Sequence, residues 1–489
     1  MNSTHTQERS MSFFGNAMYD WKGRYLFSFS ARYDGYSKLV NNKWGFFPGV
    51  SAAWNIHKEP FMQASGDWLS SLKLRVGYGQ NGNVNIAAGA YDLQGNYGKT
   101  GNYGGEYGIL INKLAYPDLR WEKTTSTDIA VEAVFWNRLS VSVGVYNKLT
   151  SDLLATVPFP SSSGVGNQTT NNGSVRNRGL ELEVDATVFK NSDWTIKVGA
   201  NATYMRSKVM TLPFNGNENN RQNGTQVYDP ETGELIWVGG YQEGQEYGVA
   251  YAYQMVDIVR DNEDLARYGW YKDTTPSSGT IYGPAIWETL TAEEQSKGQL
   301  LQLGDAVFYD VNGDRMVDQY DQVYMGNTIP RWIGGLNLSV NWKGLSLYAK
   351  FDYAADYVAV DSRRRWYMGL FQGTFNTIKE SKDSWSEHRP DATYPILMYA
   401  DNKYRNNYRL SNIFYDDCSY LCARDITLSY SLPKNWCKAM KMQDLTLSLT
   451  GQNLFYLTAS KIYSPEYGAE DEGGYGIPRT MLFGLKVTF

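Results

Sequence analysis

Alternation of apolar and polar positions is the dominant pattern along the chain. Tyr25, Phe27 and Phe29 alternate with Ser28 and Ser30. The same period of two recurs at residues 50–56, 72–79, 139–145, 180–188, 194–204, 336–342, 345–353, 426–430, 445–449 and 481–489. This period predicts β-strands with one face in apolar surroundings and the other in water. Many runs span about ten residues, which is typical of tilted transmembrane strands, whereas strands of soluble proteins average roughly five or six.

Short and long connections alternate between these runs. Tight turns are expected at residues 20–23, 137–138, 191–193 and 343–344, with moderate connections at 57–67 and 433–444. Long polar segments rich in Gly and Tyr occupy residues 80–121, 150–178, 206–330, 354–419 and 456–477. An antiparallel barrel with short periplasmic turns and long outer loops has this alternation. A Greek-key sandwich does not.

The order of the connections also limits the number of strands. The first strand, near residues 11–19, runs into a tight turn, and the last strand ends at Phe489, so both should end on the same side. We count 13 strands if residues 248–258 lie in an outer loop and 14 if they span. Parity favours 13, with residues 206–330 forming a large extracellular excursion. Since closed antiparallel barrels have an even count, the sequence predicts that strands are missing at the N-terminus.

Composition narrows the class of protein. A length of 489 residues alone would suggest two to four soluble domains. A hydrophobic fraction of 42% excludes a disordered chain, and the lack of any apolar run of roughly 20 residues excludes a helical membrane protein. With 46 basic and 51 acidic residues the chain has no excess of positive charge, so nucleic acid is not expected as a partner. The 38 Tyr and 15 Trp residues are expected mainly in belts at the membrane interfaces.

One acidic segment has the spacing of a calcium loop. Asp310, Asn312, Asp314, Asp318 and Asp321 occupy positions 1, 3, 5, 9 and 12 of that pattern. However, the sixth position is arginine instead of glycine, and the twelfth is aspartate instead of glutamate. Two readings stay open: a Ca²⁺ site that stabilises the loop, or a turn whose side chains bond their own backbone. Beyond this possible Ca²⁺, no cofactor is expected.

Two sets of side chains are candidates for ligand binding. A basic and aromatic cluster follows a predicted strand and could hold an anionic ligand or a lipopolysaccharide phosphate. Aromatic residues of the outer loops could stack on sugar rings or peptide side chains. The candidates are Arg363, Arg364, Trp366, Trp237, Tyr241 and Trp270. The three histidines are scattered and no catalytic motif is present, so no catalytic residue is assigned and an enzyme is not expected.

Three stretches together resemble one known family. Residues 30–54 contain SARYDGYSK and KWGFFPGVSAAW, and residues 304–330 read GDAVFYDVNGDRMVDQYDQVYMGNTIP. Residues 418–489 contain CSYLCARDITLSYSLP, GQNLF and the closing PRTMLFGLKVTF. In this order the three stretches resemble the SusC/RagA family of TonB-dependent outer-membrane transporters from the Bacteroidetes. The resemblance runs from about residue 8 to residue 489.

The resemblance implies a fold and a function. The family fold is all-β, a transmembrane antiparallel barrel of 22 strands with long extracellular loops, an N-terminal plug and a TonB box. Residues 1–489 would be the C-terminal part, about 13 strands, without the plug. The resemblance implies import of oligosaccharides or peptides with a SusD-like lipoprotein and, through the missing plug, the TonB complex. It also implies contact with outer-membrane lipid and lipopolysaccharide, and an aromatic C-terminus, Phe489, read as an assembly signal.

Two other hypotheses stay open from the sequence. A soluble or surface-attached β-rich glycan-binding protein would share the enrichment in Tyr, Trp and Gly, although not the strand lengths. A non-functional truncated gene product is the third hypothesis, because an open sheet in lipid leaves backbone groups unpaired at its edges.

Overall fold

One large antiparallel sheet dominates the computed structural model, which describes residues 7–84, 92–158, 162, 164–165, 167–369, 376–397, 407–462, 464–467 and 476–489. Within these residues, thirteen strands follow one another in chain order across the sheet. They are β1 (Ser10–Trp21), β2 (Tyr25–Tyr36), β3 (Trp44–Asn55), β4 (Leu69–Asn83), β7 (Glu122–Phe135), β8 (Leu139–Ser151), β11 (Ser174–Lys190), β12 (Trp194–Thr211), β23 (Trp332–Trp342), β24 (Leu345–Ala355), β27 (Tyr420–Ser431), β28 (Asp444–Gln452) and β30 (Thr480–Thr488). A short strand, β29 (Tyr456–Thr458), also pairs with β27.

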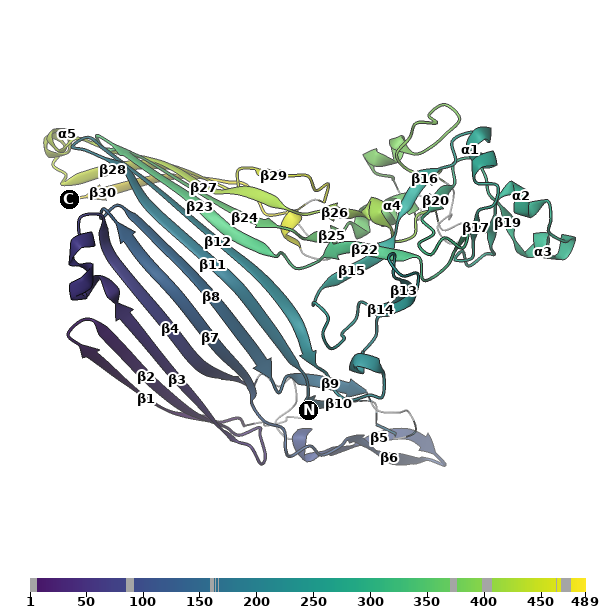
Figure 1. Ribbon diagram of the computed structural model, residues 1–489, viewed down its shortest axis with the longest axis horizontal. Coiled ribbons are helices and arrows are strands. Elements are labelled where there is room, and N and C mark those ends of the chain that lie inside the picture. Colours follow the sequence, from purple (N-terminus) through teal and green to yellow (C-terminus); the bar gives the residue numbers. More distant parts are fainter. Residues whose placement is uncertain are drawn as a thin grey trace.

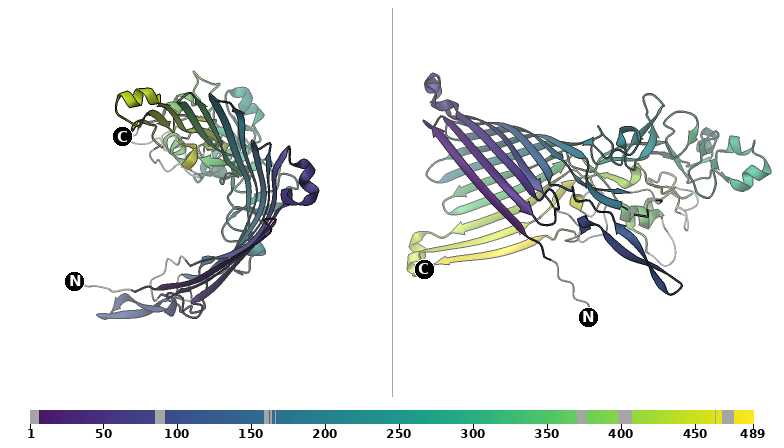
Figure 2. Two further views of the ribbon diagram at one scale, coloured as in Figure 1. Left: turned by 90° about the vertical axis from the view of Figure 1, so that its left-hand side faces the viewer. Right: turned by 90° about the horizontal axis from the view of Figure 1, so that it is seen from below.

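The sheet curves into an open trough (Figures 1 and 2). β1 and β30 form its two edges, and no pairing between them occurs among the described residues. The short connections meet at one end of the trough, and the long ones gather at the other end (Figure 1). We call these the turn end and the loop end.

The register gives the sheet two chemically different faces. Phe13 pairs with Tyr33, and Tyr33 pairs with Phe46, so these aromatic residues share one face. One position along, Ser12 pairs with Asp34 on the opposite face. Because side chains alternate across a strand, the period of two in the sequence becomes an apolar face and a polar face. The apolar face remains exposed across the sheet.

Aromatic residues border the apolar face at both ends. At the turn end Trp194 stacks on Trp342 with ring centroids 5.3 Å apart, and at the loop end Tyr204 lies 4.9 Å from Trp332. Ten positions of β12 separate Trp194 from Tyr204, about 33 Å along the strand and about 25 Å in height at a typical tilt. This height is that of the apolar band of outer-membrane barrels. The expectation that Tyr and Trp form interface belts agrees with this placement.

Outside the large sheet, the loop end carries smaller elements. These are β5 (Asn96–Tyr103) with β6 (Glu106–Lys113), β9 (Leu154–Pro158) with β10 (Asn167–Asn171), β13 (Thr225–Tyr228) with β14 (Leu235–Val238), β15 (Val249–Tyr253) with β22 (Gln322–Asn327), β16 (Met255–Ile258) with β20 (Ala306–Phe308), and the set β17 (Lys272–Asp273), β18 (Ile281–Tyr282), β19 (Gln299–Leu300) and β21 (Met316–Val317). The helices are α1 (Asn262–Arg267), α2 (Pro284–Trp287), α3 (Ala292–Lys297) and α4 (Ser362–Gly369), while α5 (Lys434–Ala439) lies at the turn end; β25 (Val358–Val360) pairs with β26 (Tyr415–Asp417).

We use the name outer lobe for residues 212–330 together with the described residues of 376–414. Apolar side chains from both segments share one core, in which Ile258 packs with Trp385 and Ala392. Ile258 and Trp385 are more than a hundred positions apart in the chain, yet their two segments form one body at the loop end (Figure 1).

The thirteen strands that follow one another across the described large sheet match the expected count, with the short β29 in addition, and residues 249–258 pair outside that sheet, as parity predicted. The predicted loop limits at residues 150–178 and 206 were wrong. β11 begins at Ser174 and β12 continues to Thr211, because the polar residues there still pair backbone to backbone across the strands. Across the described ranges no helix is both long and apolar enough to cross a membrane. Cys418, Cys422 and Cys437 are free and buried.

Candidate functional site: the polar wall and the outer lobe

The polar face of the sheet, which we call the polar wall, carries charged and amide side chains along its strands. Arg75 and Lys73 of β4 each lie 3.4 Å from the Glu132 carboxylate of β7. Asp185 of β11 and Asn337 of β23 both lie against Gly199 of β12. Such a surface is stable only against water or a polar partner, since an unpaired polar group in an apolar medium costs several kcal/mol.

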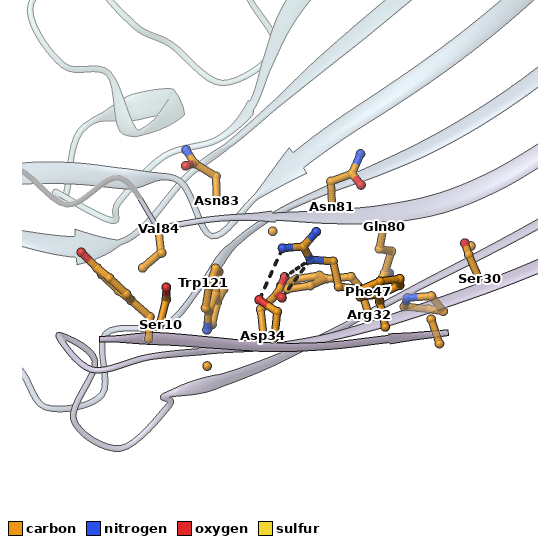
Figure 3. A pocket seen from close by; sticks show the side chains of 18 of the residues that line it. Ser10, Ser30, Arg32, Asp34, Phe47, Gln80, Asn81, Asn83, Val84 and Trp121 are labelled. Atoms are coloured by element: carbon orange, nitrogen blue, oxygen red, sulfur yellow. Dashed lines mark hydrogen bonds and ion pairs between the residues drawn. The ribbon is translucent and has the colours of Figure 1, made fainter. Parts of the chain in front are cut away.

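A cavity of about 1060 Å³ lies on the polar wall at the loop end of β1–β4. Figure 3 labels several of its lining residues, most of them from these strands, together with Val84 just after β4 and Trp121 just before β7. Arg32 Nε donates to both carboxylate oxygens of Asp34, at 2.8 and 2.6 Å, which fixes the guanidinium beside the cavity. Asn81 and Asn83 of β4 add amide groups to the lining (Figure 3).

Aromatic residues close one side of this wall cavity. The Phe47 ring meets Trp121 edge-on, with centroids 5.6 Å apart, and both side chains are buried with Leu119. Gly82 is required beneath this ring, because a Cβ at that position would collide with the Phe47 ring. The cavity therefore combines amides, an arginine and carboxylate pair, and rigid aromatic surface, which suits a polar ligand with some apolar area.

Ion pairing also fixes the mouth of the wall cavity. Lys38 Nζ lies 2.8 Å from Glu8 Oε1, and the Tyr36 hydroxyl donates to the same carboxylate at 3.0 Å. The bond from Lys38, and then that from Tyr36, lowers the pKa of Glu8. Glu8 therefore stays ionised at neutral pH and holds the loop after β2 against the segment before β1.

A buried ion pair organises the outer lobe. Arg409 Nη2 lies 2.6 Å from Asp273 Oδ2, and both side chains are almost fully buried. The guanidinium also lies over the Phe308 ring at 3.5 Å and the Tyr253 ring at 4.3 Å. Nearby, Asn407 Nδ2 donates to Asp305 at 3.0 Å, across more than a hundred residues. Sequence reasoning missed these four polar residues, because no local pattern relates positions so far apart in the chain.

Two arginines fasten loops to the rim of the sheet. Arg331, just before β23, bonds the Glu246 carboxylate through Nε at 3.2 Å and Nη2 at 2.9 Å. Arg424 of β27 makes two 2.6 Å bonds to Asp352 and one of 2.8 Å to Glu466. Paired bonds of this geometry fix orientation as well as distance. The outer lobe and the last long loop are thus held to the wall at defined points.

Comparison with known proteins identifies the family. The family model described as TonB dependent receptor-like, beta-barrel, matches residues 1–454. The chain belongs to this family. It is an outer-membrane protein with the β-barrel fold of TonB-dependent receptors, and it is similar to SusC and to the RagAB transporter.

The similar proteins are about twice as long as this receptor chain. TonB-dependent receptor P26 of Formosa agariphila is 26% identical over 100% of this chain and 47% of its own length. TonB-dependent receptor SusC of Bacteroides thetaiotaomicron is 26% identical over 99% and 44%. The solved RagAB peptide transporter superposes with a TM-score of 0.73 at 24% identity, covering 99% of this chain and 48% of that chain. The receptor chain thus spans about half the length of these relatives.

The acidic segment of the receptor folds as a set of self-bonded turns. Asp310 accepts the amides of Gly313 and Arg315 at 2.8 and 2.7 Å, and Asp321 accepts those of Val311 and Asp318 at 2.8 and 2.7 Å. Burial raises the pKa of Asp321 to about 6. No group of three or more His, Cys, Asp or Glu side chains placed to hold a metal occurs in the described ranges.

This geometry agrees with the hypothesis that residues 310–321 form turns whose side chains bond their own backbone. The oxygens of Asn312 and Asp314 likewise accept local amides, from Asp314 and Met316 respectively. Asp318, at position 9 of the pattern, accepts the Tyr320 amide at 2.7 Å. The Ca²⁺ site stays a prediction.

The basic cluster is divided between interior and surface. Arg364 is buried and bonds Asp416 at 2.8 Å and the Ile413 carbonyl at 2.9 Å, so its charge is used inside the protein. Arg363 lines a separate cavity of about 500 Å³, and Trp366 is partly exposed with its ring edge against Tyr367. Arg364 also lines this cavity, and the ligand-binding roles of Arg363, Arg364 and Trp366 stay predictions.

The remaining candidates have different neighbours. Trp237 of β14 is covered by the Arg221 guanidinium at 3.8 Å, whereas Tyr241 stacks on Tyr247 at 5.7 Å. Trp270 is exposed after α1 in the outer lobe, and Phe489 is exposed at the C-terminus, which lies at the turn end (Figure 1). The roles of these four residues in ligand binding and assembly stay predictions.

Proposed function

We propose that this chain supplies the barrel wall and outer loops of a TonB-dependent importer for oligosaccharides or peptides. The observation that carries the proposal is the two-faced sheet, with an apolar band about 25 Å high on one side and a polar wall on the other. An apolar outside and a water-facing inside suit a pore that crosses lipid. The wall cavity and the outer lobe then lie where a ligand would enter.

The proposal includes the partners that such an importer needs. A SusD-like surface lipoprotein would cover the loop end and deliver the ligand. The TonB complex would supply energy through a plug on the polar wall, whose charged and amide groups offer it hydrogen bonds. Transport, not catalysis, is the activity proposed. A soluble glycan-binding protein would have no use for the exposed apolar face of the strands.

Two experiments test the proposal at different levels. Outer-membrane extraction in detergent, followed by gel electrophoresis with and without boiling, should show the mobility shift of a folded barrel. Cells deleted for the gene should lose uptake of either labelled oligosaccharides or labelled peptides, and restoring the gene should restore uptake. An uncoupler of the proton gradient should abolish the restored uptake. Uptake that survives both deletion and uncoupling would refute the proposal.

A further inference from the structure

A second cavity, of about 560 Å³, lies where the loop ends of β11 and β12 meet the start of the outer lobe. Its volume falls in the range of small-ligand pockets, roughly 300–1,000 Å³. The strands supply its floor, and the segment around Tyr241 and Tyr247 supplies one side. We call it the rim pocket.

The floor of the rim pocket interrupts the polar wall with apolar residues. Val175 of β11 pairs with Val209 of β12, and two positions along, Asn177 pairs with Ser207. Since side chains two positions apart share a face, both valines lie on the same face as the polar pair. Val209 is only 2% exposed. Leu212 extends the apolar lining beyond the strand.

Aromatic side chains form the side of the rim pocket opposite the strands. Tyr241 and Tyr247 stack with an interplanar angle of 20°, and they are 42% and 39% exposed. Each ring contacts its partner on one side, which leaves surface on the other side for a ligand. Large exposed aromatic area beside an apolar floor is the usual composition of a pocket for a bulky apolar group.

The polar groups of the rim pocket are all uncharged. No Asp, Glu, Lys, Arg or His is found among the described residues that line it, in contrast to the wall cavity with Arg32 and Asp34. Asn177 Oδ1 accepts the Ser207 hydroxyl at 2.5 Å, and the Gln222 side chain adds a second amide. Side-chain amides are matched to the N–H and C=O groups of a peptide backbone.

We propose that the rim pocket binds a bulky apolar side chain of an uncharged peptide segment and so sets the substrate preference of the importer. A saccharide would bring several hydroxyl groups to each ring, and those that lie over Val175, Val209 and Leu212 would find no partners there. Each unpaired hydroxyl would weaken binding roughly 5- to 150-fold. An apolar side chain incurs no such penalty, and Asn177 and Gln222 can hold its backbone. The inference rests on the proposed import function and specifies its ligand class.

Calorimetry on the detergent-purified receptor chain tests this inference with three probes. Two are blocked pentapeptides that differ only in the central residue, Phe or Asp, flanked by alanines, and the third is maltohexaose. The Phe peptide should bind at least tenfold more tightly than the Asp peptide, because burying the ring is favourable and burying the carboxylate is not. Val209→Asn and Tyr241→Ala should each weaken binding of the Phe peptide about tenfold.

Tyr97→Ala is the matched control, because Tyr97 is an exposed tyrosine of β5 outside the rim pocket. This variant should bind the Phe peptide as the parent does. Tyr241→Ala removes an exposed ring, so its effect can be measured even if Val209→Asn disturbs folding. Equal binding of both peptides, tighter binding of maltohexaose, or no binding of any probe would overturn the inference. None of these results alters the uptake test, which separately decides the import function.

Discussion

Removing Asp273 should destabilise the outer lobe strongly while leaving the barrel wall intact. The Asp273 and Arg409 side chains are 2% and 5% exposed, and their charged atoms lie 2.6 Å apart. Asp273→Ala leaves the guanidinium buried and without its carboxylate, which typically costs about 3–5 kcal/mol. Contact with the rings of Phe308 and Tyr253 persists in this variant. Those contacts stabilise the guanidinium by at most about 2 kcal/mol, which is less than the cost of losing its carboxylate partner.

Two further variants measure how much of the lost stability comes from the unpaired buried charge. The double variant Asp273→Leu with Arg409→Met removes both charges and should recover most of the loss, since apolar replacements of buried pairs are often neutral. Arg267→Met is the control, because the Arg267 side chain is 56% exposed where it pairs with Asp257. Loss of such an exposed pair should cost less than about 1 kcal/mol.

Hydrogen exchange measured by mass spectrometry gives the local free energy of opening for each variant. Segments around residues 251–282 and 306–317 should lose protection in Asp273→Ala, while β7 and β8 should keep theirs. A change of less than about 0.5 kcal/mol in the protection of the lobe in Asp273→Ala, which is within ordinary surface effects, would refute the predicted cost of the unpaired charge. A double variant as unstable as the single one would also refute it.

Three further predictions concern other parts of the molecule. Because the folded pKa of Asp321 is raised to about 6, the loop should lose stability as pH rises from about 4 to about 7, by up to roughly 3 kcal/mol. Asp321→Asn should flatten this dependence in pH-dependent exchange, and a calorimetric Ca²⁺ signal that disappears in Asp314→Ala would establish the metal site. Val143→Arg on the apolar face should lower barrel stability by about 2–4 kcal/mol in refolding titrations. Ser142→Arg on the polar wall should lower it by less than about 1 kcal/mol, the usual effect of a surface change. Equal losses of stability would refute the assignment of the two faces. Phe489→Ala should reduce the amount of heat-modifiable protein in outer-membrane fractions, and an unchanged amount would remove the assembly role.

The large sheet could be predicted from the sequence because each strand has its own alternation of apolar and polar residues and is bounded by turn residues. Alternation assigns the two faces, and turn residues such as those at 343–344 set the register of neighbouring strands. Strand ends were predicted less well, as at Thr211, because polar residues there do not alternate and only the backbone pairing continues. Pattern reasoning cannot detect pairing of that kind.

The outer lobe and the rim pocket could not be predicted from the sequence. The ion pair of Arg409 with Asp273 and the shared lining of the rim pocket by Val175 and Tyr241 both involve segments that are distant in the chain. Tyr241 was selected only as a loop aromatic, with no indication that it lines a pocket together with two valines. Arg364 was selected for its charge, although the chain uses that charge internally. Local composition shows which residues have useful chemistry but not which neighbours they meet.

The arginine clamp between Arg331 and Glu246 has a consequence for binding kinetics. It holds the outer lobe against the rim close to Tyr247, so both sides of the rim pocket are assembled before any ligand arrives. Ordering a loop during association slows binding and costs roughly 0.5–1.5 kcal/mol for each immobilised side chain. A receptor that avoids this step should bind its ligand in a single kinetic phase. Differences in affinity between substrates should then come from their dissociation rates.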